Sequence, residues 1–413
     1  MGKPMFQECS DTQSLPSSLQ KICFFFNAQI HHLFHALPLA LELSRDPNFH
    51  VDIVSPSEGH LALAREIAAH HRAGDIRFIR TGGAGLSALT WLSRSSTPPK
   101  LPSLIAACST LRNYDAIVVA ERTSLLLRHL GLRNSCFIHT CHGAGDRAVG
   151  YDPRIRNFDF VLLAGDKQRR RMLDKGLIRE GHYAIVGYSK FELASAQDSD
   201  GLFPERRPVV LYNPHFSKRL SSWDSMGIDI IEQFAADDRF NLIVAPHIRL
   251  FDNRAQRAAM ERRLTEFSRL PHIHIDLGSL ACVDMRYVEA ASLYIGDVSS
   301  QVYEYIRRPR PCLFLNAHGA SWQDNADYRH WHYGPVLENC EYIINKAALA
   351  IASHDRYAHA QYEGIADTFG ELEDRPSANA ARVVRTFLTR RQLVHAIADR
   401  GGAIPEQGAF AHE

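Results

Sequence analysis

The sequence has little excess of charge of either sign, few cysteines and no long hydrophobic run. Its 413 residues carry 47 lysines and arginines against 46 aspartates and glutamates, so a general nucleic-acid-binding surface is not expected. The eight cysteines contain no CxxC pair, and most of them lie in apolar, strand-like segments. This pattern is typical of buried free thiols in a reducing compartment.

The sequence also lacks the features of a secreted or membrane-spanning protein. Residues 1–20 are polar and contain no apolar core of the length that a signal peptide needs. The longest apolar stretches are too short to cross a bilayer. We therefore expect a cytoplasmic protein, with any contact to the inner face of the cytoplasmic membrane being peripheral.

Short apolar segments alternate with amphipathic ones along most of the chain, which predicts an α/β protein. A chain of this length is too long for one core and predicts two doubly wound domains. We expect a flexible leader over 1–20, an N-terminal domain over 21–192 and a polar linker over 193–207. A C-terminal domain over 208–375 and a closing helix with a tail over 376–413 complete the chain. The Gly-, Ser- and Pro-rich segment 81–102 is predicted to be a loop, and 342–345 a last strand.

The segment from Ala291 to Asn316 is the most informative part of the sequence. An apolar strand breaks at Gly296 and Asp297, and Ser299 and Ser300 follow where a helix is predicted to begin. Ligands of open α/β sheets collect beyond the carboxyl ends of strands, and helix N-termini bind anions. Asp297, Ser299 and Ser300 are therefore predicted to bind the phosphates of a nucleotide-linked substrate. The alternative is an ordinary helix-capping turn.

The sequence HGAGDR (142–147) follows another predicted strand. Its glycines allow the backbone to approach a ligand closely, but it is not a GxGxxG dinucleotide fingerprint. His142 is a candidate general base, because histidine titrates near neutral pH. A structural histidine in a glycine turn is the alternative. Asp146 is a candidate to orient His142, or to cap the next segment.

Two further polar clusters follow strands in the second half. The first contains the donors and acceptors Asn213, His215, Ser217, Lys218 and Arg219, of which Lys218 and Arg219 suit a diphosphate. A solvated basic loop is the alternative. The second contains His247, with Arg249 two residues further on.

Three histidines, His31, His32 and His35, follow the first predicted strand. No carboxylate or cysteine lies at ligand spacing from them, so contact with an acceptor or helix capping is favoured over a metal site. The basic run KQRRR (167–171) is interpreted as a solvated helix face, with contact to anionic lipid headgroups as the alternative.

In this order, the motifs resemble those of the CDP-glycerol glycerophosphotransferase family, the teichoic-acid polymerases and primases. His142 and Gly143 match the histidine–glycine motif that carries the proposed base of that family. The turn with Asp297, Ser299 and Ser300, together with Glu304, looks like its donor-binding motif. The resemblance covers roughly residues 136–316 and is strongest at this last motif.

Two other positions resemble the family less closely. The segment that opens the second domain of the family is similar to the one that contains Tyr212, Pro214 and Lys218 or Arg219. The family has a His-Pro pair where this chain has the reverse order, Pro246 and His247.

The resemblance implies a GT-B-like fold, with two facing Rossmann-like domains and a cleft between them. It implies transfer of glycerol phosphate or a related phospho-polyol from a CDP-linked donor to a hydroxyl of a cell-envelope glycan or lipid-linked acceptor, without a metal or other cofactor. The expected catalytic residues are His142, His247 and Asp146. The expected donor-binding residues are Asn213, Ser217, Lys218, Arg219, Asp297, Ser299, Ser300 and Glu304, and those on the acceptor side are His31, His32 and Gly143. The alternatives are a nucleotide-sugar glycosyltransferase, a UDP-sugar 2-epimerase, and a non-catalytic nucleotide-binding protein.

Overall fold

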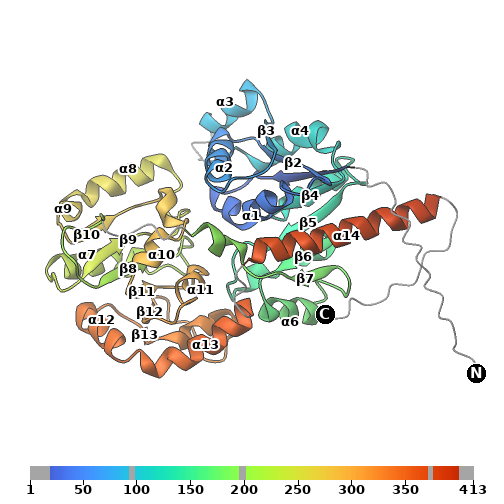
Figure 1. The fold of residues 1–413 in the computed structure, drawn as a ribbon. Coiled ribbons are helices and arrows are strands. Elements are labelled where there is room, and N and C mark those ends of the chain that lie inside the picture. The colour runs from blue at the N-terminus through green and yellow to red at the C-terminus, as the bar shows by residue number, and fades with distance from the viewer. Residues whose placement is uncertain (1–18, 93–97, 195–200, 371–374, 400–413) are drawn as a thin grey trace, which may run out of the picture.

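The computed structural model describes residues 19–92, 98–194, 201–370 and 375–399. Figure 1 shows two α/β domains, each built on a parallel sheet. The predicted leader lies outside the described residues except at its end, because β1 already begins at Gln20. Part of the predicted linker also lies outside them.

The N-terminal sheet has seven strands in the order β3-β2-β1-β4-β5-β6-β7. They are β1 (Gln20–Phe25), β2 (Phe49–Ser55), β3 (Ile76–Arg80), β4 (Ala116–Val119), β5 (Cys136–Thr140), β6 (Phe160–Leu163) and β7 (Tyr183–Ile185). The helices between them are α1 (Leu33–Leu43), α2 (Glu58–His70), α3 (Ala84–Leu92), α4 (Lys100–Leu111), α5 (Leu126–His129) and α6 (Asp166–Asp174). The central strands are buried on both faces, which explains their nearly continuous apolar sequences.

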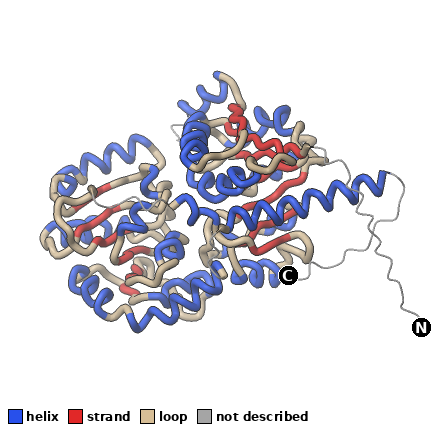
Figure 2. The backbone as a smooth tube through the Cα atoms, viewed as in Figure 1, coloured by secondary structure: helices blue, strands red, loops and turns tan. Residues whose placement is uncertain are grey.

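The C-terminal sheet has six strands in the order β10-β9-β8-β11-β12-β13. They are β8 (Val209–Asn213), β9 (Asn241–Val244), β10 (Ile273–Ile275), β11 (Leu293–Gly296), β12 (Cys312–Leu315) and β13 (Val336–Leu337). Its helices are α7 (Ile228–Ala235), α8 (Arg254–Arg263), α9 (Thr265–Ser268), α10 (Arg286–Ala290), α11 (Gln301–Tyr305), α12 (Ile343–Ala352) and α13 (Asp355–Phe369). Figure 2 shows helices surrounding both sheets.

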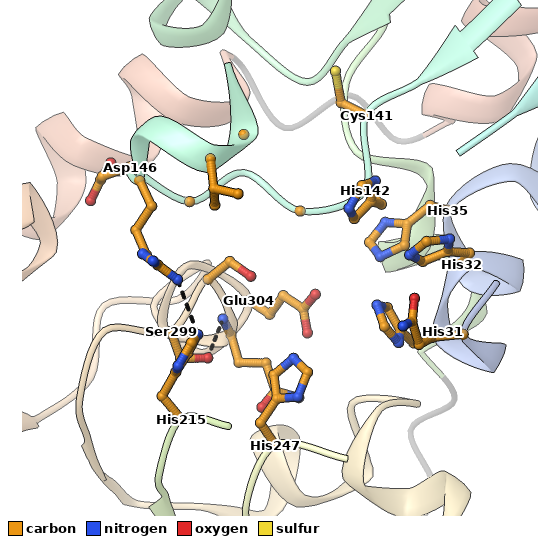
Figure 3. Close-up of a pocket in the computed structure, with 18 of the residues that line it drawn as sticks. His31, His32, His35, Cys141, His142, Asp146, His215, His247, Ser299 and Glu304 are labelled. Atoms are coloured by element: carbon orange, nitrogen blue, oxygen red, sulfur yellow. Dashed lines mark hydrogen bonds between the residues drawn. The ribbon is translucent and has the colours of Figure 1, made fainter. Parts of the chain in front are cut away.

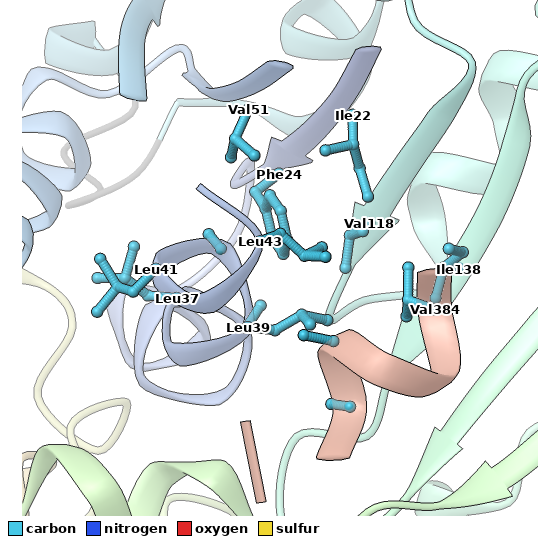
Figure 4. Packing of buried hydrophobic residues seen from close by; sticks show 14 of the residues in the cluster. Ile22, Phe24, Leu37, Leu39, Leu41, Leu43, Val51, Val118, Ile138 and Val384 are labelled. Atoms are coloured by element: carbon cyan, nitrogen blue, oxygen red, sulfur yellow. The ribbon is translucent and has the colours of Figure 1, made fainter. Parts of the chain in front are cut away.

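The last helix, α14 (Pro376–Asp399), returns to the N-terminal domain. Val384 joins the core that α1 forms with the sheet, where it packs in a cluster with Leu39 and Ile138 (Figure 4). A fully buried side chain of this size contributes roughly 1.5–3 kcal/mol. The helix therefore fastens the end of the chain to the domain in which the chain began.

Two elements differ from the sequence predictions. The segment 81–102 contains helix α3 and the start of α4, although a loop was predicted. Of the predicted strand 342–345, Tyr342 caps helix α12 and residues 343–345 begin it, and the last strand of the described residues is β13. In the described part of the chain, no helix is long and apolar enough to cross a membrane.

Candidate active site between the domains

A cavity of about 280 Å³ lies between the two domains. The carboxyl ends of the parallel strands in each sheet share one edge, and the loops that follow them form the cavity wall. The wall includes His31 and His32 after β1, His142 after β5, His215 after β8, His247 after β9 and Ser299 after β11 (Figure 3). It also includes Arg122 after β4. Motifs that are far apart in the sequence therefore meet in one place.

The two domains touch at this cavity. A Cβ atom at Gly145 would lie 2.9 Å from the Cβ of Ser300, and one at Gly143 would lie 3.2 Å from the Ser300 Oγ. Gly143 also has a φ of +93°, which favours glycine. The glycines were predicted to admit a ligand, and the structure shows that they admit the opposite domain.

His142 lies on the N-terminal wall with its ring centroid 4.4 Å from that of His32. Its Nδ1 atom is buried and has no hydrogen-bond partner. Burial, together with the positive charge of Arg122, lowers the pKa of His142 to about 4. The ring is therefore neutral at pH 7 and can accept a proton.

The sequence suggested that Asp146 could orient His142, but in the structure the Asp146 carboxylate is bound by other residues. Its carboxylate accepts hydrogen bonds from the Lys167 Nζ at 2.9 Å, the Tyr303 hydroxyl at 2.7 and 2.8 Å, and the His330 Nδ1 and backbone N–H at 2.9 and 3.1 Å. Burial would raise the pKa of Asp146, but Lys167 and His330 hold it well below its usual range. Because Tyr303 and His330 belong to the C-terminal domain, Asp146 connects the domains.

The basic run at 167–171 is also not a free cationic face. Lys167 is buried against Asp146. Arg170 forms ion pairs with Asp166 and Asp367, and Arg171 pairs with Asp327 at 2.6 Å. These acidic partners neutralise much of the positive charge that contact with anionic lipid headgroups would require.

Glu304 lines the cavity, but its carboxylate is already engaged. Lys190 donates to both carboxylate oxygens at 2.7 Å, and the Tyr188 hydroxyl donates to one of them at 2.8 Å. Lys190 and Tyr188 follow β7 in the N-terminal domain. Lys190–Glu304 is thus a second buried ion pair between the domains.

Two histidines of the C-terminal wall present N–H donors. The His247 Nδ1 accepts from the Arg249 backbone N–H at 3.2 Å, and the His215 Nδ1 accepts from the Ser217 backbone N–H at 3.0 Å. Burial lowers the pKa of each ring to about 3, with nearby cationic groups adding to the effect. Each neutral ring therefore carries its proton on Nε2.

Arg147 reaches across the cleft towards His215. Its Nη1 lies 3.4 Å from the His215 Nε2, drawn as a dashed line in Figure 3. Both atoms are donors, so the contact is unfavourable until an acceptor atom lies beside them. Arg249 is also in the cavity wall, with its guanidinium 4.0 Å from the Phe216 ring centroid. These donors and cations form a site suited to an anion.

Several residues predicted to bind the donor lie outside the cavity wall. Asn213 is buried between the Ala245 carbonyl, at 2.6 Å, and the Tyr294 hydroxyl, at 3.0 Å. Lys218 and Arg219 are exposed, and neither they nor Ser217 line the cavity. After His215 the chain turns outward, so Arg147 and Arg249 occupy the place expected for Lys218 and Arg219.

Asp297 lies behind the wall. Its Oδ2 accepts from the backbone N–H groups of His215 and Ser222 at 2.8 and 2.9 Å. Burial raises the pKa of Asp297 to about 6. Its carboxylate holds the loop after β8 against the end of β11, and it positions His215 without facing the cavity.

Ser299 and Ser300 do line the cavity, in front of a helix of only five residues. Such a short helix has a weak dipole, so side chains carry most of the capacity to bind an anion. The Ser299 Oγ accepts the Gln301 backbone N–H at 3.3 Å, which is a capping contact. Ser300 is exposed towards the cleft. In the part of the chain that the structure describes, no three His, Cys, Asp or Glu side chains are arranged to hold a metal ion.

The buried neutral histidines predict that acid destabilises the protein. The pKa values of His60 and His142 are lowered to about 4, and that of His247 to about 3. Below pH 6.5 the unfolded chain binds protons that the folded chain does not, so each group costs about 1.4 kcal/mol per pH unit down to its folded pKa. Protonation of Asp297 has the opposite effect: it stabilises the folded protein as the pH falls from about 6 to about 4, because the pKa of this carboxyl is raised in the folded state.

Urea unfolding at pH 7.5, 6.0 and 5.0 should therefore give a free energy of unfolding that falls with the pH. His142→Asn should make this dependence shallower, whereas replacing the exposed His359 should not change it. A free energy that stays constant or rises towards pH 5 would contradict the burial of neutral histidines.

No protein-family model matches the chain, and no curated protein matches it in sequence. Solved structures do match. A structure of the wall teichoic acid polymerase TagF soaked with CDPG has a TM-score of 0.61 and 13% identity, covering 91% of this chain and 90% of that chain. The chain has the GT-B fold. A putative UDP-N-acetylglucosamine 2-epimerase from Listeria monocytogenes gives a TM-score of 0.58 with 14% identity over 95% of this chain and 99% of its own. MnaA from S. aureus, solved with UDP, gives a TM-score of 0.57 with 12% identity over 95% of this chain and 100% of its own.

Proposed function

We propose that this GT-B protein transfers glycerol phosphate, or a related phospho-polyol, from a CDP-linked donor to an acceptor hydroxyl. The observation that carries the proposal is the asymmetry of the cavity. One wall carries the neutral ring of His142, whose buried Nδ1 has no hydrogen-bond partner, and the other carries the Nε2–H groups of His215 and His247. A base facing a cluster of donors suits proton abstraction on one side and a diphosphate on the other.

In the proposed step, the acceptor oxygen forms a bond to the distal phosphorus of the donor. The bond from that phosphorus to the bridging oxygen breaks, and CMP leaves with the electron pair. His142 takes the proton of the acceptor hydroxyl. His247, His215 and Arg147 stabilise the negative charge that develops on the phosphates, in a cleft from which the closed domains exclude much of the water.

A second candidate is a nucleotide-sugar enzyme, either a glycosyltransferase or a UDP-sugar 2-epimerase. The fold likeness to a putative UDP-N-acetylglucosamine 2-epimerase, and to MnaA solved with UDP, favours it. Incubation with CDP-glycerol, CDP-ribitol and UDP-N-acetylglucosamine separates the candidates. Release of CMP supports the phospho-polyol transferase, whereas UDP release or an epimerised sugar contradicts it. Nucleotide binding without turnover of any donor would indicate a non-catalytic protein.

The double variant Ser299→Ala with Ser300→Ala should bind CDP-glycerol more weakly. Each lost hydrogen bond to a phosphate is expected to cost about 1 kcal/mol or more. Calorimetric titration measures this loss, with the surface variant Ser268→Ala on α9 as the matched control. Equal donor affinity in both variants would argue against a phosphate beside the turn that follows β11.

A further inference from the structure

Lys190 is a buried cation in the cavity wall that the proposed transfer step does not use. Its side chain is 4% exposed, and it lies on the short helix Ser189–Leu193, where the chain leaves the N-terminal domain after β7. Burial is the main cause of the lowered pKa of His31 and of His247, and Lys190 is among the charges that add to it in both rings. Lys190 therefore lies where the two walls of the cavity meet.

Lys190 and Tyr188 together hold the carboxylate of Glu304, which lies between the two walls (Figure 3). The Lys190 Nζ donates to both carboxylate oxygens at 2.7 Å, and the Tyr188 hydroxyl donates to Oε1 at 2.8 Å. A carboxylate has about four positions at which it can accept a hydrogen bond. These contacts leave one position for a ligand, and because Glu304 lines the cavity, a hydroxyl of a bound ligand can donate to it.

The segment that carries Lys190 is also joined to the place where the chain returns to the N-terminal domain. Glu192 accepts from the Ser377 backbone N–H at 2.6 Å and from the Ser377 Oγ at 2.5 Å. A Cβ atom at Gly187 would lie 3.0 Å from the Cβ of Pro376. Since α13 of the C-terminal domain ends at Phe369 and α14 begins at Pro376, these contacts hold the passages between the domains side by side. Lys190 connects them to Glu304 on α11.

We propose that Lys190 is a positioning residue that couples the cavity to the segments joining the domains. It orients the Glu304 carboxylate for a hydrogen bond from a hydroxyl of a nucleotide-linked ligand, and that bond in turn fixes residues 187–194. The physical reason is that a buried polar network becomes rigid when all of its members are satisfied. The inference rests on the proposed function only for the class of ligand, and it adds the residue through which the joining segments respond to that ligand.

Hydrogen exchange of the full chain tests this coupling, with CDP and inorganic pyrophosphate as ligands, each at a concentration that calorimetry shows to be saturating. Pyrophosphate carries the phosphates of CDP without a hydroxyl group on carbon. CDP should slow exchange in residues 187–194 about tenfold, as expected for one added hydrogen bond to a charged group. Pyrophosphate should slow exchange at the turn before α11 but leave residues 187–194 unchanged.

Lys190→Met, which keeps an apolar stem but removes the charge, should abolish the effect of CDP on residues 187–194, and Lys190→Arg should keep part of it. Lys175→Met, which changes an exposed lysine after α6, is the matched control. If Lys190→Met does not fold, Tyr188→Phe tests the same network with the ion pair intact and should weaken the effect. Its matched control is Tyr183→Phe, because the Tyr183 hydroxyl donates to the exposed Glu180 at 2.7 Å.

Glu192→Gln separates this coupling from a purely structural role. The variant weakens the bonds to Ser377 but leaves Lys190 and Glu304 in place. CDP should therefore still slow exchange in residues 187–194, but it should slow exchange at the start of α14 less than in the wild type. The affinity for CDP should stay the same, because Glu192 does not line the cavity.

Equal effects of CDP and pyrophosphate on residues 187–194, or the same CDP effect in Lys190→Met as in the wild type, would overturn the proposal. With CDP-glycerol as donor, Lys190→Met should also raise the KM for the donor more than it lowers kcat. The exchange experiments need no turnover. A protein that shows the coupling but transfers nothing would therefore refute the proposed function and not the role of Lys190, whereas transfer without any CDP effect on residues 187–194 would do the reverse.

Discussion

Replacement of His142 by asparagine is expected to lower the rate of transfer from CDP-glycerol by a factor of about 10²–10⁴, the usual contribution of a general base. The ring is neutral at pH 7 and its Nδ1 has no partner, so it is free to take the acceptor proton. Asparagine fills similar space but cannot accept a proton at this pH. The affinity for the donor should stay close to that of the wild type, because the proposed phosphate contacts come from other residues.

CMP release and single-turnover rates measure this effect, and calorimetry with CDP-glycerol measures donor affinity. The control is His129→Asn, which changes an exposed histidine of α5 in the same domain. A turnover number within a few-fold of the wild type would show that another group takes the proton. A large loss of donor affinity would instead place His142 on the donor side of the cavity.

The residues that could be predicted from the sequence are those that directly follow buried strands. His142, His247 and Ser299 each come within a few residues of the end of an apolar segment, and parallel strands bring such positions to one edge. The two doubly wound domains were predictable from the order of strands and helices, and the GT-B fold was expected from the resemblance of the motifs to a known family. His215 was recognised as part of a polar cluster, although the neighbouring Lys218 and Arg219 were expected to bind the phosphates.

The failure at Lys218 and Arg219 has a physical cause. The direction in which a loop turns after its strand depends on contacts with distant residues, here the hydrogen bonds of the Asp297 carboxylate to the loop after β8. No local pattern encodes this direction. The predicted loop at 81–102 failed differently, because Gly, Ser and Pro punctuate the segment and yet α3 and α4 form within it.

The contacts between the domains could not be predicted from a single sequence. Lys190 and Glu304 are separated by 114 residues, and Asp146 and His330 by 184. Neither Lys190 nor His330 follows a strand in a recognisable motif. Only a buried carboxylate with several donors around it identifies such a contact, and burial is a property of the folded chain.

The cluster around Asp146 leads to the largest expected loss of stability. Asp146→Asn keeps the size of the side chain but removes the charge that compensates Lys167, which is itself buried. An uncompensated buried charge typically costs 3–5 kcal/mol. The free energy of unfolding in urea should therefore fall by about that amount, and the transition should broaden if the domains no longer unfold together.

Asp166→Asn is the matched control, because it makes the same change in ion pairs with Arg169 and Arg170 that are partly exposed. That variant should lose less than about 1 kcal/mol. Comparable losses in the two variants would mean that the Asp146 cluster contributes no more than a surface pair. In that case other contacts, such as the Lys190–Glu304 ion pair and the close approach of Gly143 and Gly145 to Ser300, would hold the cleft closed.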